Sequence, residues 1–343
     1  MKALQLTEPR SFHLIDLPEP PPPGPGEALL RVHQVGICGT DYSGYLGKMP
    51  FFSYPRIPGH ELGVEVTAVG EDVTHLKPGD RASVEPYISC YRCHACQRGH
   101  TNCCEHNQTL GVHCDGGLRP YFTVPARKVH PSTRLTFEQL ALVETLAIGC
   151  HAVNRAAPQP SETVLVVGAG PIGLSAIEFA RLSGARTVVM DMNEDRLAFV
   201  RDRLGVSDTL LSRGDGQELT ALRDLTGGAL ADVTIDATGS HHSMSTSLEY
   251  CAFAGRWVYV GITQEKVSFL HAPIFHRREI TLLASRNALP DDFTRIIRAI
   301  EDGHLRTDPW ITHRTTLEAV PEIFPTYLLP ETRVIKALVE VTA

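Results

Sequence analysis

Two groups of metal-ligand residue types stand out in this 343-residue chain. The first is a run of closely spaced cysteines, Cys90, Cys93, Cys96 and Cys104. Four thiolates from one short loop suit a tetrahedral zinc ion whose positions are all filled by protein, which is a structural rather than a catalytic arrangement. Cys103 sits beside Cys104 and could replace it as the fourth ligand. The run therefore predicts a structural zinc site with its last ligand undecided.

The second group is dispersed and consists of Cys38 in GICGTD, His60 and Glu61 in PGHELG, and Glu144 in LVETLAIGC. Three protein ligands with one open position are typical of catalytic zinc. Adjacent side chains on a strand or bend point in different directions, so either Glu61 or Glu144 can supply the carboxylate. Zinc lowers the pKa of bound water from about 15.7 to about 7, and an alcohol likewise loses its proton before giving up hydride. We predict two zinc ions per chain, one structural and one catalytic.

A glycine fingerprint predicts a dinucleotide site. Gly168, Gly170 and Gly173 form GAGPIG directly after the strand-like TVLVV and open an apolar helix, where backbone N–H groups can receive a pyrophosphate. Asp191 ends the next strand-like segment and can accept hydrogen bonds from ribose hydroxyls, which favours NAD over NADP. Arg196 could soften this preference. The predicted cofactor contacts are Gly168, Gly170, Pro171, Ile172, Gly173, Asp191, Arg196, Thr238 and Gly261.

The elements that position these residues follow two patterns. Residues 1–150 read mainly as short alternating strands, interrupted by PEPPPPGPG and by the cysteine loop 88–105, and the pattern becomes helical from Thr136. Residues 151–284 alternate apolar strands with helix-length segments, which predicts a doubly wound parallel sheet. Residues 285–343 contain a further helix and a terminal strand. The predicted fold class is α/β.

Composition excludes several function classes. The chain has 32 Lys and Arg against 39 Asp and Glu, a net charge of −7, and no long basic run, which argues against nucleic acid or an acidic membrane as partner. The sequence has no stretch near the ~18 apolar residues of a membrane span and no secretion signal pattern, so we expect a soluble cytoplasmic protein. Nine cysteines in such a protein fit metal-binding thiolates better than disulfides.

Taken together, GICGTD, PGHELGVEV, the four-cysteine loop and VLVVGAGPIGLSA resemble the zinc-dependent medium-chain dehydrogenase/reductase family over essentially the whole chain. The resemblance implies a GroES-like catalytic domain interrupted by a Rossmann domain, so residues 285–343 are expected to complete the first domain. It also implies a homo-oligomer, either a dimer or a tetramer, formed through the edge of the Rossmann sheet.

Within this family, Glu144 in place of a second cysteine ligand resembles the polyol and sugar-acid branch. The long strings MPFFSYPRIPGHE, TNCCEHNQTLGVHCDGG and FHRREITLLASRNALPDDF resemble the sugar-acid dehydrogenases of this branch. That resemblance implies a sugar-acid substrate, an L-galactonate-like aldonate. Such a substrate carries a carboxylate, for which Arg56 and Arg286 are candidate partners. A polyol or L-threonine is the alternative substrate.

Two residues depart from the family pattern. Ser43 occupies the position of a histidine that relays the substrate proton together with a threonine, here Thr40, and Thr145 replaces the usual proline after the ligand glutamate. A serine cannot accept a proton at neutral pH. We therefore expect the alcohol proton to leave through Thr40 to solvent, or through water on Glu61 or Glu144.

Two other classes of protein share some of these features. A non-catalytic binding protein could keep the scaffold and its zinc, but the complete ligand set and glycine fingerprint argue against it. An iron–sulfur protein also uses CxxCxxC, although the ferredoxin pattern places its last cysteine about four positions on, followed by proline. Here the last cysteine comes eight positions later, and Glu105 follows it.

Overall fold

The computed structural model describes residues 1–342, which form two compact units. Unit 1 contains residues 1–145 and the C-terminal segment from Leu289 onward, and unit 2 contains residues 146–288. The division falls within helix α3 (Phe137–Ala156). Unit 1 is thus built from two distant parts of the chain.

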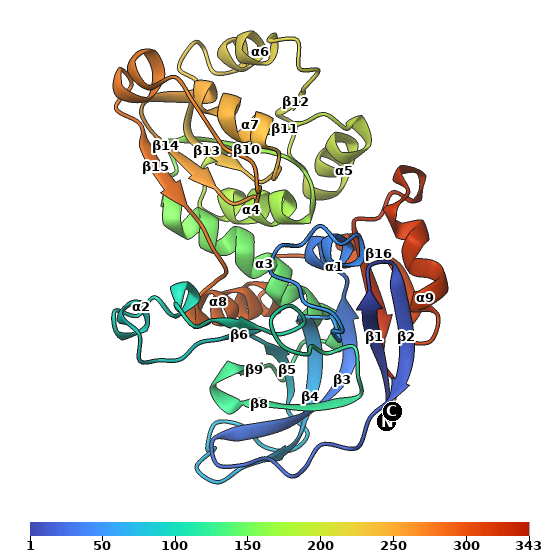
Figure 1. The fold of residues 1–343 in the computed structure, drawn as a ribbon. Coiled ribbons are helices and arrows are strands. Elements are labelled where there is room, and N and C mark those ends of the chain that lie inside the picture. The colour runs from blue at the N-terminus through green and yellow to red at the C-terminus, as the bar shows by residue number, and fades with distance from the viewer. Residues whose placement is uncertain (343) are drawn as a thin grey trace. The chain divides into compact units, whose positions relative to one another are not determined.

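A seven-stranded sheet is the main element of unit 1. Its strands follow the order β16 (Ile311–Thr316), β17 (Lys336–Glu340), β3 (Glu27–Gly36), β4 (Glu61–Val69), β5 (Arg81–Val84) and β9 (Val129–Pro131), and β8 (Tyr121–Pro125) also pairs with β3. Leucine and valine alternate with polar residues along β3, so one face of the strand packs into the core. The C-terminal β17 pairs antiparallel with β3. Figure 1 shows the red C-terminal segment beside the blue N-terminal strands.

The remaining elements of unit 1 are short. Strands β1 (Lys2–Glu8) and β2 (Ser11–Asp16) form a hairpin, and β6 (Tyr87–Ile88) pairs with β7 (Gln108–Thr109). The α-helices described in unit 1 besides α3 are α1 (Gly39–Tyr45), α2 (His94–Gln97), α8 (Pro290–Glu301) and α9 (Val320–Ile323). Aromatic and aliphatic side chains from both parts of the chain fill one core, including Phe12, Leu30, Phe122, Phe324 and Val339.

Unit 2 contains a six-stranded, wholly parallel sheet. Its strands follow the order β12 (Thr209–Leu211), β11 (Arg186–Asp191), β10 (Thr163–Val167), β13 (Ala231–Asp236), β14 (Cys251–Tyr259) and β15 (Thr281–Ala284). Numbered within the unit this order is 3-2-1-4-5-6, the arrangement of dinucleotide-binding sheets. The central strands are buried valine, isoleucine and leucine runs, as both faces of such a sheet are covered. The predicted doubly wound sheet is confirmed.

Four α-helices lie in the connections between β10, β11, β12, β13 and β14: α4 (Pro171–Leu182), α5 (Glu194–Leu204), α6 (Glu218–Leu225) and α7 (His241–Thr246). Pro171 begins α4, where its missing N–H costs nothing, and the Asn193 side chain caps the first turn of α5. The helix that follows the glycine turn therefore begins where the sequence predicts.

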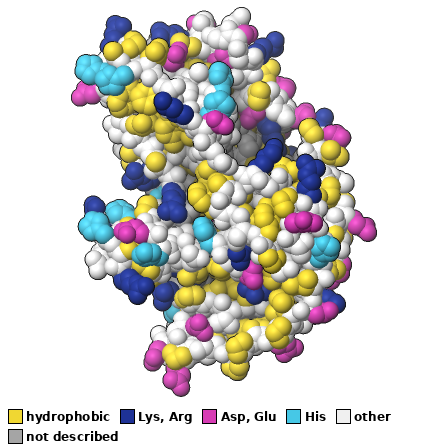
Figure 2. Space-filling model, in the orientation of Figure 1, with side chains coloured by type: hydrophobic (Ala, Val, Ile, Leu, Met, Phe, Trp, Pro, Cys, Tyr) yellow, Lys and Arg dark blue, Asp and Glu magenta, His cyan; other side chains and the backbone are white. Residues whose placement is uncertain are grey.

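The surface carries charges of both signs. Figure 2 shows lysine and arginine side chains interspersed with aspartate and glutamate over the face that it draws. Among residues 1–342, no helix is both long and apolar enough to cross a membrane.

Candidate active site

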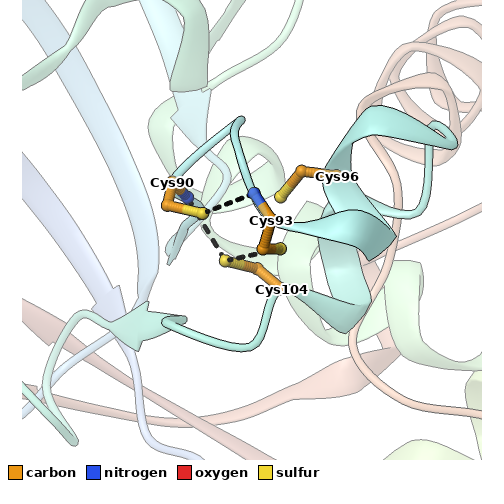
Figure 3. A group of neighbouring side chains, drawn as sticks. All are labelled: Cys90, Cys93, Cys96 and Cys104. Carbon is orange, nitrogen blue, oxygen red and sulfur yellow. Dashed lines mark hydrogen bonds between the residues drawn. The ribbon is translucent and has the colours of Figure 1, made fainter.

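The four-cysteine group is brought together by the loop around α2. The ligand atoms of Cys90, Cys93, Cys96 and Cys104 all lie within 4.8 Å of one another, and Figure 3 shows their sulfur atoms turned towards a common point. The Sγ atoms of Cys93 and Cys104 are 3.9 Å apart. Tetrahedral zinc with Zn–S bonds of about 2.3 Å requires a sulfur separation of roughly 3.8 Å, so the group fits zinc.

The backbone of the loop donates hydrogen bonds to two of these sulfurs, those of Cys90 and Cys104. The N–H groups of Cys90 and His106 donate to Cys104 Sγ, at 3.2 and 3.3 Å. A hydrogen bond from the Arg92 N–H is the main cause that lowers the pKa of Cys90 from 9.0 to about 6. Cys104 is 2% exposed, whereas the Cys103 side chain points to the surface and lies outside the group. The structure therefore places Cys104 at the fourth position.

A second group of potential ligands lies at the end of the sheet in unit 1. Cys38 precedes α1, His60 precedes β4, and Glu61 is the first residue of β4. Their ligand atoms lie within 4.8 Å of one another. Glu61 stands opposite Gly36 in the β3–β4 register, so strand pairing carries the carboxylate towards the chain that leads to Cys38. A thiolate, an imidazole and a carboxylate at this spacing can hold a zinc ion.

Asp41 supports two of these residues from α1. One of its carboxylate oxygens accepts a 2.9 Å hydrogen bond from the Cys38 N–H, and the other lies 4.0 Å from His60 Nδ1. A carboxylate beside the ring orients the imidazole and favours presentation of its other nitrogen to a metal. Thr40 and Ser43 lie in the same helix and are half-buried.

Glu61 is held by a buried lysine. Both of its carboxylate oxygens accept hydrogen bonds from Lys336 Nζ at 2.7 Å, and the two side chains are 0% and 1% exposed. Burial raises the pKa of Glu61, but the ammonium of Lys336 and then His60 outweigh burial and lower it overall. The same lysine donates to the carbonyl oxygen of Ile37 at 3.2 Å. Glu61 thus remains ionised and forms an ion pair with Lys336.

Glu144 has a neutral partner instead. It lies in α3, is buried, and accepts a hydrogen bond from the Tyr87 hydroxyl through Oε1. Burial raises the pKa of Glu144, opposed by the charge of His60. The carboxylate oxygens of Glu144 are not within 4.8 Å of the ligand atoms of all three members of the Cys38 group. The charges of His60 and Glu61 nevertheless shift the pKa of Glu144, the first downward and the second upward. The two candidate carboxylates therefore differ in their partners, one being ionic and the other a hydroxyl.

The glycine turn in unit 2 has the backbone of a phosphate-binding loop. Gly168 has a φ of +94°, and a Cβ at Gly173 would lie 1.7 Å from the Gly168 carbonyl oxygen. Nothing lies within 4 Å of a Cβ built at Gly170. Two of the glycines are therefore required by the fold, whereas Gly170 faces open space at the N-terminus of α4, where a pyrophosphate can approach. Pro171 and Ile172, the first residues of that helix, are half-buried.

The other predicted cofactor residues lie at the carboxyl ends of the parallel strands. Asp191 ends β11, and its two oxygens accept from the N–H groups of Ala169, at 2.5 Å, and Asn193, at 2.8 Å. Arg196 is half-buried in the first turn of α5. Thr238 and Gly261 follow β13 and β14, which is the edge where ligands bind in such sheets.

The two predicted substrate arginines have different surroundings. Arg56 donates to Asp115 Oδ1 at 3.0 Å and to the Ser53 hydroxyl at 2.6 Å, and Asp115 also accepts from the Ile57 N–H. Arg56 therefore ties two loops of unit 1 together. Arg286 is exposed in the segment that follows β15 of unit 2.

Sequence reasoning missed Asp41, Tyr87 and Lys336. A lysine in the apolar run VIKALVEV is a usable signal, because a charge in a buried strand requires a partner. Asp41 lies inside the quoted GICGTD, but its side-chain contacts depend on how α1 begins. Tyr87 carries no local signal.

Comparison with known proteins identifies the family of this chain. Two family models match the chain, an alcohol dehydrogenase GroES-like domain over residues 24–134 and a zinc-binding dehydrogenase over residues 171–302. With the relatives below, they show that the chain belongs to the zinc-containing medium-chain alcohol dehydrogenase family. It is an enzyme, and the predicted combination of a GroES-like part with a doubly wound sheet is confirmed.

The chain is 40% identical to L-galactonate-5-dehydrogenase of Escherichia coli K12 over 94% of each chain. It is 34% identical to L-arabinitol 4-dehydrogenase of Aspergillus oryzae, over 91% of this chain and 85% of that one. Among solved structures, a short chain alcohol dehydrogenase from E. coli CFT073 in complex with NADH superposes with a TM-score of 0.91 at 26% identity, covering 99% of both chains.

Proposed function

We propose that this enzyme oxidises a secondary alcohol of a sugar acid, with an L-galactonate-like aldonate as the favoured substrate, and passes the hydride to NAD. The observation that carries the proposal is the Cys38, His60 and Glu61 group with Glu144 nearby, in a chain 40% identical to an L-galactonate dehydrogenase. A zinc ion in this group would supply the positive charge that makes the alcohol hydroxyl acidic.

Cys38, His60 and Glu144 are the protein ligands in this proposal. A carboxylate bound by an ammonium has part of its charge neutralised, so Glu61 is the weaker ligand and acts as a nearby counter-charge. Glu144 accepts from a neutral hydroxyl, which orients one oxygen and leaves the other for the metal. Cys90, Cys93, Cys96 and Cys104 hold the structural zinc.

NAD is the proposed cofactor because of Asp191. The N–H groups of Ala169 and Asn193 fix its carboxylate at the end of β11, where it can accept hydrogen bonds from both ribose hydroxyls. A 2′-phosphate at that place would meet a negative charge. Arg196 is near enough in sequence to reduce this penalty without reversing it.

The alcohol proton leaves through the Thr40 hydroxyl in this proposal. Ser43 lies three residues on, in the same helix, and can pass on a hydrogen bond but cannot hold the proton at neutral pH. Thr40 passes the proton to solvent, and water on Glu61 or Glu144 is the alternative route. Replacing Ser43 with histidine tests this route. If the missing histidine relay limits the rate, the variant should turn over faster than the wild type at low pH. An unchanged rate at low pH would show that the relay is not limiting.

The decisive experiment is a screen of NADH absorbance with aldonates, neutral polyols and L-threonine, each with and without a chelator. We expect the highest kcat/KM with an aldonate, and loss of activity on metal removal. Zinc analysis of the same sample should give two ions per chain. Chelator-resistant activity or a single zinc per chain would contradict the proposed catalytic site.

Substrate charge is tested separately at Arg286 and Arg56. Replacing Arg286 with alanine should raise KM for aldonates and leave KM for neutral polyols unchanged. Arg56 also anchors a loop through Asp115, so its replacement tests substrate binding only if the melting temperature is retained. Equal changes in KM for charged and neutral substrates would show that neither arginine binds the substrate carboxylate.

A polyol is the second candidate substrate. The 34% identity to L-arabinitol 4-dehydrogenase supports it, because that chain is matched over most of its length. The same screen separates the two candidates, since a polyol enzyme would turn over neutral substrates at least as well as aldonates.

The proposed quaternary structure is a homo-oligomer formed through β15. This strand is at the edge of the sheet, pairs with β14 on one side, and carries the partly exposed Leu282. An open edge of this kind can continue the sheet into a second copy. Light scattering of the purified protein should give a dimer or tetramer mass, and a monomer would exclude this assembly.

A further inference from the structure

The last residue of β13, Asp236, collects hydrogen bonds from three different segments of unit 2. Its Oδ1 atom accepts from the N–H and the hydroxyl of Thr238, at 3.0 and 2.7 Å. Its Oδ2 atom accepts from the hydroxyls of Ser243 in α7, at 2.7 Å, and Ser247, at 2.9 Å. Asp236 is completely buried. Four donors on one buried carboxylate form a fully satisfied centre, which rigidifies the groups that it binds.

The backbone of Asp236 binds a fourth segment. Its carbonyl oxygen accepts from the N–H groups of Val260 and Gly261, at 3.0 and 3.2 Å. A Cβ at Gly261 would lie 2.3 Å from the Gly239 nitrogen, so the loops after β13 and β14 are in direct backbone contact. The loop after β13 therefore begins at Asp236, and the loop after β14 is hydrogen-bonded to the same residue.

The same residue lies beside the glycine turn. Asp236 is opposite Val167 in the register of β13 and β10, and Gly168 follows Val167 directly. A Cβ built at Gly168 would lie 3.1 Å from Thr238 Cγ2. The loop that Asp236 holds thus packs against the turn expected to receive the pyrophosphate.

We propose that Asp236 is a positioning residue for the dinucleotide, holding Thr238 and Gly261 at fixed places beside the glycine turn. It does not touch the cofactor, because it is buried beneath the two loops. This inference rests on the proposed function, since it requires unit 2 to bind NAD. A carboxylate suits the position, because its two oxygens can accept hydrogen bonds from all four donors.

The test compares Asp236→Asn and Asp236→Ala with the wild type by titrating NADH fluorescence. Loss of the Asp236 carboxylate should raise the Kd for NADH by on the order of tenfold or more in the alanine variant, as expected when supporting groups of a site are lost. The asparagine variant keeps one acceptor oxygen, and the two serine hydroxyls can turn to accept from its amide. Its Kd for NADH should therefore lie between those of the wild type and the alanine variant. KM for NAD should rise with the Kd, while KM for the alcohol at saturating NAD should change little.

Asp232 provides a matched control at the opposite end of the same strand. Its Oδ2 atom accepts from the Thr163 N–H at 2.8 Å, near the amino ends of the strands. Asp232→Asn makes the same chemical change and should leave the Kd for NADH unchanged. Melting temperatures of all variants show whether each one folds. If Asp236→Ala does not fold, Asp236→Asn carries the test.

The outcomes distinguish the positioning role of Asp236 from dinucleotide binding by unit 2 itself. An unchanged Kd in folded Asp236 variants overturns the positioning role, as does an equal rise in Asp232→Asn. A wild-type protein that binds neither NADH nor NADPH overturns the proposed function and this inference with it. A rise confined to the Asp236 variants, with the intermediate value for asparagine, supports both.

Discussion

The pairing of Glu61 with Lys336 predicts an unusual effect on metal affinity. Lys336→Met removes the ammonium that donates to both Glu61 oxygens at 2.7 Å, while the methionine fills similar space. Removing one partner of a buried pair leaves an uncompensated charge and costs about 3–5 kcal/mol of stability. The same change also removes a positive charge close to the proposed metal. Stability should therefore fall while zinc affinity rises.

The size of the affinity gain follows from the geometry. Lys336 Nζ is 2.7 Å from Glu61, whose ligand atom lies within 4.8 Å of those of Cys38 and His60, so the ammonium is within about 7.5 Å of the group. Two unit charges at about 7.5 Å interact by about 2 kcal/mol at an effective dielectric constant near 20. Since about 1.4 kcal/mol is tenfold, zinc binding at this group should tighten more than tenfold.

Lys128→Met is the matched control. Lys128 forms an ion pair with Glu85, and both side chains are 0% exposed, but neither belongs to the Cys38 group. The two variants should lose similar stability in thermal unfolding. Zinc affinity, measured by competition with a chelator, should tighten only in Lys336→Met. Equal zinc affinities in Lys336→Met and the wild type would refute the electrostatic link between Glu61 and the metal.

Three further predictions concern other parts of the chain. Cys104→Ser should reduce zinc content by one ion per chain, while Cys103→Ser should leave it at two, as measured by atomic absorption. Gly173→Ala should unfold at a lower temperature because its Cβ meets a carbonyl oxygen, whereas Gly170→Ala should fold normally and bind NADH less tightly. Burial raises the pKa of Glu218, but hydrogen bonds from backbone N–H groups outweigh it and lower the pKa from 4.5 to about 2. Its ionised form therefore stabilises the fold above pH 4.5, and this contribution disappears as the pH falls towards 2. Glu218→Gln should lower stability at pH 6 and match the wild type near pH 2, and a constant difference in unfolding free energy across that range would contradict this.

Local motifs made much of the site predictable. The glycine turn can be recognised because strand, turn and helix are contiguous, and each glycine has its own steric reason. The cysteine loop is equally local, since its ligands fall within 15 residues. Cys103 and Cys104 could not be separated in this way. Neighbouring residues point in different directions, and only the folded loop shows that Cys104 turns inward while Cys103 is exposed.

The sequence by itself determined the family, the parallel sheet and the residue types that can bind zinc and a dinucleotide, because these depend on periodicity and short spacings. The tertiary structure decided the partners of the buried charges. Lys336 meets Glu61 across 275 positions, and Tyr87 meets Glu144 across 57. A buried carboxylate must find a donor wherever the fold brings one, so the partner leaves no trace in the local pattern. That partner distinguishes the two glutamates, which are chemically alike in the sequence.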